Sequence, residues 1–234
     1  MTSRTLTGGL LVAVPLIFTA GFTGLQMSFE YPGILRHPAG EVLTRFAAGR
    51  TDLHVYWYLM FVAGVLLIPA AIGWALLNFK EHPVYATLAG GFGAVAGLVQ
   101  ALGLLRWTVL VPMLAANYVA PGATDMDEAL AASAFDTANA YLGMGVGEHM
   151  GYLFTALFTV MVSLVLLKRW AVMGWLGFVL AIGVATGMLE PFGVAGASMI
   201  NALAFTAWSI WALVLGVLIL WRGRSMEASV LAAA

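Results

Sequence analysis

Residues 143–170 read GMGVGEHMGYLFTALFTVMVSLVLLKRW, and this stretch decides what kind of fold the chain adopts. It is a long apolar run that begins beside two ionisable residues, Glu148 and His149, and ends at the basic pair Lys168 and Arg169. About 20 apolar residues in a helix, at 1.5 Å each, cross a hydrocarbon layer of about 30 Å. The stretch therefore predicts a transmembrane helix with Glu148 near one edge of the hydrocarbon.

The composition of the whole chain is that of a membrane protein. Of its 234 residues, 62% are hydrophobic and 9% are charged, whereas soluble domains carry about 25% charged residues. The chain has no cysteine, which excludes disulfides, thiol catalysis and thiolate metal ligands. Its net charge of -1 and the lack of a basic block argue against a nucleic-acid partner. The lipid bilayer is therefore the expected partner.

Six apolar runs are long enough to span a membrane. We therefore predict an all-α fold, a polytopic membrane helix bundle of about six transmembrane helices with amphipathic helices in the outer loops. Residues 1–234 are expected to form a single integral membrane domain. The predicted spans are Gly8–Met27, His54–Phe79, Val84–Leu105, Gly147–Leu167, Ala171–Leu189 and Met199–Trp221.

The charges between the spans favour one orientation in the cell membrane, because basic residues are enriched in cytoplasmic loops. Six basic residues flank one side, namely Arg4, Lys80, Lys168, Arg169, Arg222 and Arg224, against four on the other, Arg36, Arg45, Arg50 and Arg106. Nine of the eleven acidic residues lie on that second side. We expect both termini in the cytoplasm. The first span also has the start of a signal peptide, but no clean cleavage site precedes Glu30, so we expect it to be retained.

Two long outer segments each carry a predicted amphipathic helix. In Ser28–Leu53, Pro38 can open a short helix that lies on the outer membrane interface, with Val42, Leu43 and Phe46 on one side. In Arg106–Val146, Thr124 or Asp125 can cap a second helix. We expect this helix to run on into the fourth span, with a kink at the glycines between Gly143 and Gly147.

Polar side chains follow one face of two spans. Starting from Glu148 and turning 100° per residue, a polar stripe within about 80° is formed by Glu148, Tyr152, Thr155, Thr159 and Ser163. His149 lies 100° from Glu148 and only borders this stripe. A matching stripe on the first span consists of Thr19, Thr23, Gln26 and Glu30. Hydroxyls in membrane helices either line cavities or bond neighbouring helices and their own carbonyls, and the pattern does not choose between these roles.

The leading hypothesis is an integral membrane protein that binds a small ligand in an outward-facing polar pocket between helices, as a sensor or a carrier. Ionisable groups at membrane depth are costly unless a cavity or a partner receives them. Arg106 would pair with Glu148 or hold an anionic ligand. The expected ligand-binding residues are Gln26, His54, Arg106, Glu148, His149, Tyr152, Thr155 and Thr159, with Thr19 and Thr23 also on the floor of the pocket.

Two alternatives remain open. The first is a b-type haem or metal site, for which His54 and His149 are the candidate ligands and His37 a further one, although no paired histidine motif occurs. The second is a membrane-embedded enzyme that acts on a lipid-soluble substrate, with Glu148 as candidate catalytic acid or base. The cofactor, if any, would be haem or a metal ion. A homo-oligomer is compatible with all three hypotheses.

Three stretches point to a family. YPGILRHPAGEVLTRFAAG, LLRWTVLVPMLAANY and YLGMGVGEHMGYLFTALFT resemble a bacterial group of multi-span proteins catalogued as domain of unknown function 4386. The resemblance covers most of the chain, and its most specific part is the Gly-Glu-His stretch. It implies about six or seven spans in a bacterial inner membrane and no established reaction. It also implies that Arg106, Glu148, His149 and Tyr152 belong to the family signature.

Overall fold

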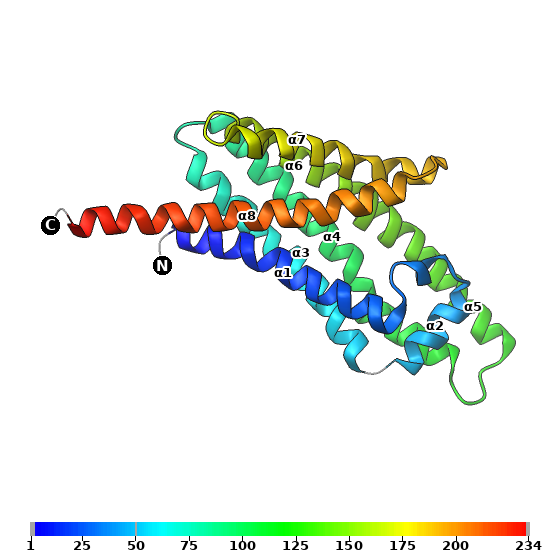
Figure 1. Cartoon of the computed structure of the whole chain (residues 1–234). Helices are drawn as coiled ribbons and strands as arrows, with labels where there is room; N and C mark the ends of the chain where they lie inside the picture. Colours follow the sequence, from blue (N-terminus) through cyan, green and yellow to red (C-terminus); the bar gives the residue numbers. More distant parts are fainter. Residues whose placement is uncertain (1–2, 50, 233–234) are drawn as a thin grey trace. The chain divides into compact units, whose positions relative to one another are not determined.

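The described part of the chain is helical, as predicted. The computed structural model describes residues 3–49 and 51–232, with side chains up to residue 222, and no strand occurs among these residues. Six helical stretches are long and apolar enough to cross a membrane (Figure 1). They are α1 (Ser3–Phe29), α3 (Thr51–Asn78), α4 (Pro83–Tyr118), α5 to α6 (Asp125–Leu166), α7 with η3 (Ala171–Phe192) and α8 (Ala197–Ala232). The polytopic bundle is therefore confirmed.

One predicted boundary was wrong, and the difference matters for the site. The third span was expected to end at Leu105, but α4 continues to Tyr118. The residues after Arg106 remain apolar, and at helical spacing they bury Trp107, Val111, Leu114 and Ala115. The buried side of the helix thus continues past the charge, and Arg106 lies inside α4 instead of closing it.

The described residues form two compact units, each with its own core. Unit 1 contains Met1–Leu16, Gly64–Leu98 and His149–Ala234, and unit 2 contains Ile17–Ala63 and Val99–Glu148. The core of unit 1 includes Leu67, Trp74, Phe158, Val162, Trp208 and Leu215. The core of unit 2 includes Leu25, Phe46, Trp57, Trp107, Val111 and Phe135. The single integral domain over residues 1–234 stays a prediction.

In unit 1, the hydroxyl group of Thr159 on α6 (Gly151–Leu166) bonds a neighbouring helix. Figure 1 shows α6 beside α7 (Ala171–Ala185). Thr155, Thr159 and Ser163 are fully buried. The hydroxyl of Thr159 donates to the carbonyl of Thr155 at 2.7 Å and accepts from the indole N–H of Trp208 at 2.8 Å. Thr159 therefore bonds its own helix and a neighbouring one, which is the second of the two roles considered for membrane hydroxyls.

In unit 2, α2 (Ala39–Ala48) packs on the protein with its apolar side. Pro38 precedes it, and Val42, Leu43 and Phe46 are buried, as the sequence predicted. These side chains belong to the core of unit 2, and α2 contacts α5 (Asp125–Ala138), so the apolar side packs against protein; the expected position of the helix on the membrane interface stays a prediction. Burial against protein removes the apolar side from both water and lipid.

The fourth span has the predicted start and an irregular middle. Thr124 caps α5: its hydroxyl accepts from the N–H of Asp127, whose carboxylate accepts from the N–H of Thr124 in return. This capping box confirms the predicted cap. The chain then continues through η2 (Asn139–Met150), which is a π-helix, into α6. The glycines expected to kink the span lie within this π-helix.

Candidate functional site

The π-helix η2 is the most unusual element of unit 2. Helices of this type are rare, usually single turns, and occur frequently at functional sites. Here it extends over 12 residues, from Asn139 to Met150. It comes very close to α4, because a Cβ atom built on Gly103 would lie 2.6 Å from the Cα atom of Gly147. Two glycines facing each other thus let the backbones of α4 and η2 touch.

The side chain of Arg106, on α4, reaches η2 beside this contact inside unit 2. Its side chain is 7% exposed, which is unusual for a charged residue in a membrane helix. Nη1 donates to the carbonyl of Gly103, and Nη2 donates to Oδ1 of Asn139 at 3.0 Å. A Cβ atom on Gly143 would lie 2.5 Å from Nη2, so a larger residue there would force the guanidinium to shift. Within the described residues, Nε of Arg106 has no hydrogen-bond acceptor.

Glu148 and Tyr31 complete a group that we call the Arg106 centre, consisting of Tyr31, Arg106, Asn139, Gly143 and Glu148. Glu148 interacts electrostatically with both Arg106 and Tyr31. Burial raises the pKa of Tyr31, the negative charge of Glu148 raises it further, and the positive charge of Arg106 acts in the opposite direction. Tyr31 therefore stays a neutral phenol. The centre contains one cation, one anion and two uncharged hydrogen-bonding side chains.

The position of Tyr31 follows from the end of α1. Glu30 adopts a left-handed backbone conformation with φ of 54°, which ends the helix. The N–H of Tyr31 then donates back to the carbonyl of Leu25 at 3.3 Å. Its ring lies edge-on to Trp57, with 5.0 Å between the ring centroids. The connection after α1 thus places a phenol beside the core of unit 2.

An aromatic cluster adjoins the Arg106 centre. Trp57 and Trp107 stack with centroids 4.3 Å apart and planes within 1° of parallel. The Cζ atom of Arg106 lies 5.4 Å from the ring centroid of Trp107, in the range of a cation–π contact. In the described part of the chain, the indole N–H groups of both tryptophans are buried without an acceptor. Like Nε of Arg106, they are donors.

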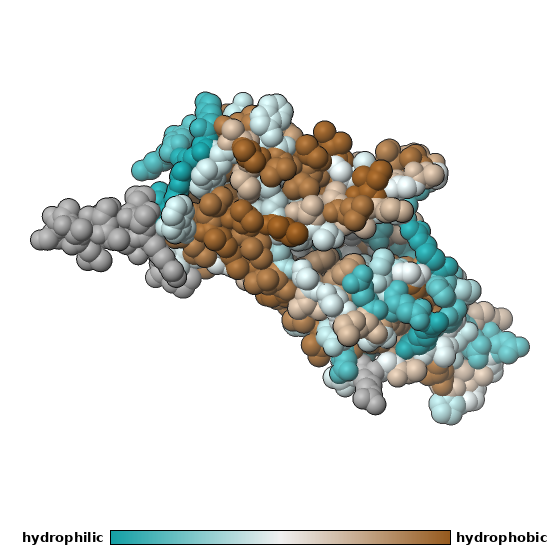
Figure 2. Space-filling model, viewed as in Figure 1, coloured by the Kyte–Doolittle hydropathy of each residue, from teal (hydrophilic) through white to brown (hydrophobic). Residues whose placement is uncertain are grey.

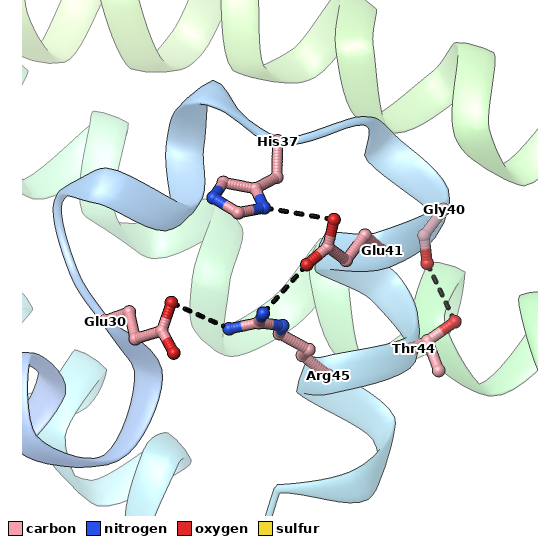
Figure 3. Close-up of polar contacts among 6 residues, drawn as sticks. All are labelled: Glu30, His37, Gly40, Glu41, Thr44 and Arg45. Carbon is pink, nitrogen blue, oxygen red and sulfur yellow. Dashed lines mark hydrogen bonds and ion pairs between the residues drawn. The ribbon is translucent and has the colours of Figure 1, made fainter.

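An ion network fastens the segment that precedes and includes α2 (Figure 3). Arg45 contacts Glu41 at 2.8 Å and Glu30 at 2.9 Å, and Nδ1 of His37 lies 3.0 Å from Glu41. The network joins the end of α1 to α2, whose Phe46 packs against Trp107 with centroids 5.9 Å apart. It thereby holds α2 over the aromatic cluster.

This network predicts a loss of stability in acid. The hydrogen bond from His37, together with the charges of His37 and Arg45, lowers the pKa of Glu41 from its ordinary value of 4.5. A carboxylate with a lowered pKa stabilises the folded state above its ordinary pKa, and this contribution disappears as the pH falls through the folded value. We expect the Tm to fall below about pH 4.5, and to fall less in Glu41→Gln. Asp136→Asn, at an exposed position on α5, is the matched control. An equal effect of both substitutions on the pH profile contradicts the prediction.

The structure brings two of the predicted ligand-binding residues together, while two others are exposed in unit 2 and four belong to unit 1. Arg106 and Glu148 interact within unit 2. Gln26 is exposed on α1, as are Thr19 and Thr23 of the predicted pocket floor. His54 is also exposed and lies against Phe46, with ring centroids 5.2 Å apart. The remaining predicted residues belong to unit 1, where they are His149, Tyr152, Thr155 and Thr159.

In unit 1, Tyr152 lies at a helix junction. Its ring packs against Phe205 with centroids 5.7 Å apart, and a Cβ atom on Gly187 would lie 2.5 Å from two of its ring carbons. The amide of Asn201 donates to the carbonyl of Val184 at 2.7 Å, near the point where α7 passes into η3 (Thr186–Phe192). Tyr152 thus packs into this junction.

Two of the histidines considered as metal or haem ligands, His37 and His54, contact other side chains. Across the part of the chain that the structure describes, no group of three or more His, Asp or Glu side chains is placed to hold a metal ion. His37 is engaged with Glu41, and His54 lies against Phe46. The metal or haem alternative therefore gains no support from this arrangement.

Sequence reasoning missed Tyr31, Asn139 and the tryptophan pair. Asn139 reaches Arg106 across 33 residues of sequence, so no local spacing connects the two. One signal was available for Trp107, since it directly follows the only basic residue within the apolar run of α4. A tryptophan next to an arginine at membrane depth is a candidate cation–π partner.

The fold and the Arg106 centre define the class of this molecule: it is an integral membrane protein of six spanning helices with an ionisable group buried in one of them. The model of the family described as Domain of unknown function (DUF4386) matches residues 6–223. The chain belongs to this family, which confirms the resemblance seen in the sequence. Comparison with curated proteins and with solved structures gave no match.

Proposed function

We propose that the protein binds a small amphipathic ligand with an anionic head group at the Arg106 centre, as a sensor or a carrier. The observation that carries this proposal is the buried guanidinium of Arg106, whose Nε has no acceptor among the described residues. An ionisable residue within a membrane span is costly and usually functional. A buried donor without an acceptor costs about 1–3 kcal/mol, which a ligand oxygen would recover.

The chemistry of the centre favours an acceptor-rich ligand. The unpartnered buried side-chain atoms of unit 2 within the described residues are all N–H donors, namely those of Trp57, Arg106 and Trp107. Arginine binds carboxylate and phosphate groups through its planar set of donors. The half-buried side chains of Tyr31, Asn139 and Glu148 mark the side from which a head group would approach. The adjoining aromatic rings suit an apolar tail.

We further propose that both termini face the cytoplasm and that the connection after α1 faces outward. The basic side chains of unit 1, namely Arg4, Lys80, Lys168, Arg169 and Arg222, flank its spans at the ends expected inside by the distribution of positive charge. The chain has no cysteine, so single cysteines can be introduced without background. A membrane-impermeant maleimide applied to intact cells should label a cysteine at Asp125 and not one at Lys80, and the reverse result contradicts the orientation.

The ligand class can be tested with head groups on one common chain. Purified protein is mixed with decanoate, decyl phosphate or decanol, and the Tm is measured. The two anions should raise the Tm, since a ligand at 100 times its Kd stabilises by about 2.7 kcal/mol, and decanol should not. Arg106→Lys keeps the charge but loses the planar donors, so we expect a much smaller shift. Arg36→Lys, at an exposed position, is the control. Equal shifts with all three probes would falsify the proposal.

A further inference from the structure

Unit 1 carries a basic surface at the ends of three apolar spans. We call it the basic patch: Lys80 and Glu81 on the α3–α4 connection, Lys168 to Trp170 on the α6–α7 connection, and Arg222 on α8. Figure 2 shows hydrophilic residues gathered where Figure 1 places the two connections. All four basic side chains are exposed. The basic patch is therefore available to a ligand in the solvent or at the membrane surface.

Two guanidinium groups of the basic patch are held in place. Nη2 of Arg169 lies 2.8 Å and 3.1 Å from the two carboxylate oxygens of Glu81, which joins the two connections. The Cζ atom of Arg222 lies 4.4 Å from the ring centroid of Trp170. The backbone N–H of Trp170 donates to the carbonyl of Leu166 at 2.7 Å, which fixes the main chain at this residue. Cations held in this way lose less conformational freedom when they bind an anion.

Among the side chains that the structure describes, the basic patch holds more basic groups than acids. It contains four basic side chains and one acid, Glu81. The other acid of unit 1 with a described side chain is Glu190, which lies in η3 at the far end of α7. Exposed Phe79 and Trp221 adjoin Lys80 and Arg222 in sequence. Aromatic side chains beside basic ones are typical of the boundary between hydrocarbon and head groups.

We propose that the basic patch binds the head group of an anionic phospholipid. Its phosphodiester carries a single negative charge and oxygen acceptors that match guanidinium and ammonium donors. The adjoining rings are of the kind that lies at the boundary between lipid head groups and acyl chains. This site is separate from the Arg106 centre, and it rests on different observations from the proposed function.

Binding is measured by native mass spectrometry of the full chain in mild detergent, titrated with phosphatidylglycerol or with phosphatidylcholine of the same acyl chains. We expect preferential binding of phosphatidylglycerol that weakens as salt is raised. Each basic residue near an anionic lipid contributes a factor of about five in affinity. Lys80→Gln and Lys168→Gln should each weaken binding about fivefold, and the double variant about 25-fold. Within the described residues neither lysine forms an ion pair or a side-chain hydrogen bond, unlike Arg169 with Glu81, so folding should be retained.

Arg36→Gln, outside unit 1, is the matched control and should leave lipid binding unchanged. Equal binding of the two lipids, or equal losses in Arg36→Gln and Lys80→Gln, overturns the proposal. Inorganic phosphate and glycerol phosphate are added as competitors at millimolar concentration. Little competition supports a lipid site, whereas displacement at micromolar concentration means a site for a free phosphate compound and also overturns the proposal.

Discussion

Arg106→Met is expected to lower the free energy of unfolding by about 3–5 kcal/mol, the usual cost of removing one member of a buried charged group. Methionine has a similar length but no donors, so the carbonyl of Gly103 and Oδ1 of Asn139 lose their partner. Glu148 also loses the positive charge with which it interacts. A buried acceptor or charge that is left without its partner accounts for most of such losses.

The second substitution in this test is Glu148→Met, made alone and together with Arg106→Met. If the two charges stabilise each other, the double variant should be less destabilised than the sum of the single variants by about 1 kcal/mol or more. Lys80→Met, at an exposed position, should change stability by no more than about 0.5 kcal/mol. Unfolding in detergent, followed by tryptophan fluorescence, measures all four. Strict additivity would mean that Arg106 and Glu148 are energetically independent.

The membrane class was predictable from sequence because the bilayer imposes a length and a polarity that few sequences satisfy by accident. The cap at Thr124, the helix after Pro38 and the long fourth span were also predictable, since local side chains decide them. The end of α4 was not. Arg106 was taken as the end of a span because a charge usually marks the edge of the membrane, but here Asn139 and the carbonyl of Gly103 receive it inside the helix.

The candidate site was predictable only in part, and for a physical reason. Arg106 and Glu148 are ionisable groups in apolar surroundings, so their residue type alone identifies them. Asn139 and Tyr31 are ordinary polar residues, and only tertiary packing shows that they belong with Arg106. The polar stripe of α1 stays a prediction, since Gln26 and its neighbours are exposed. A stripe shows which side of a helix is polar, but not what that side faces.

The π-helix was foreseen only as a kink. Glycines at Gly143, Gly145 and Gly147 indicate an irregular or closely packed backbone, and they do not say which. In the structure the backbone is both irregular and closely packed, because η2 is a π-helix and Gly147 touches α4 at Gly103. This arrangement places Asn139 and Glu148, at opposite ends of η2, within the reach of one arginine. The Arg106 centre therefore depends on the contact between η2 and α4.

Gly103→Ala should break that contact and lower the free energy of unfolding by about 1–3 kcal/mol, as overpacking does in well-packed interiors. The added Cβ would lie 2.6 Å from the Cα atom of Gly147 and 3.0 Å from the carbonyl oxygen of Leu142. Both are backbone atoms, so no side-chain rotation relieves the clash and η2 must move away from α4. The hydrogen bond between Arg106 and Asn139 bridges these two elements, and we expect it to weaken with them.

The same helix offers the matched control. At Gly91 of α4 an added Cβ meets nothing within 4 Å, so Gly91→Ala should be neutral or stabilising, since alanine favours a helix by up to about 1 kcal/mol over glycine. Gly147→Ala, whose nearest contact would be 3.1 Å, should lie between the two. We expect the Tm to be lowest in Gly103→Ala, intermediate in Gly147→Ala and highest in Gly91→Ala. If decanoate also raises the Tm of the other two variants but not that of Gly103→Ala, the ligand site depends on the contact between α4 and η2. If Gly103→Ala behaves like Gly91→Ala, then α4 and η2 are not in backbone contact, and the Arg106 centre cannot be assembled in the way described.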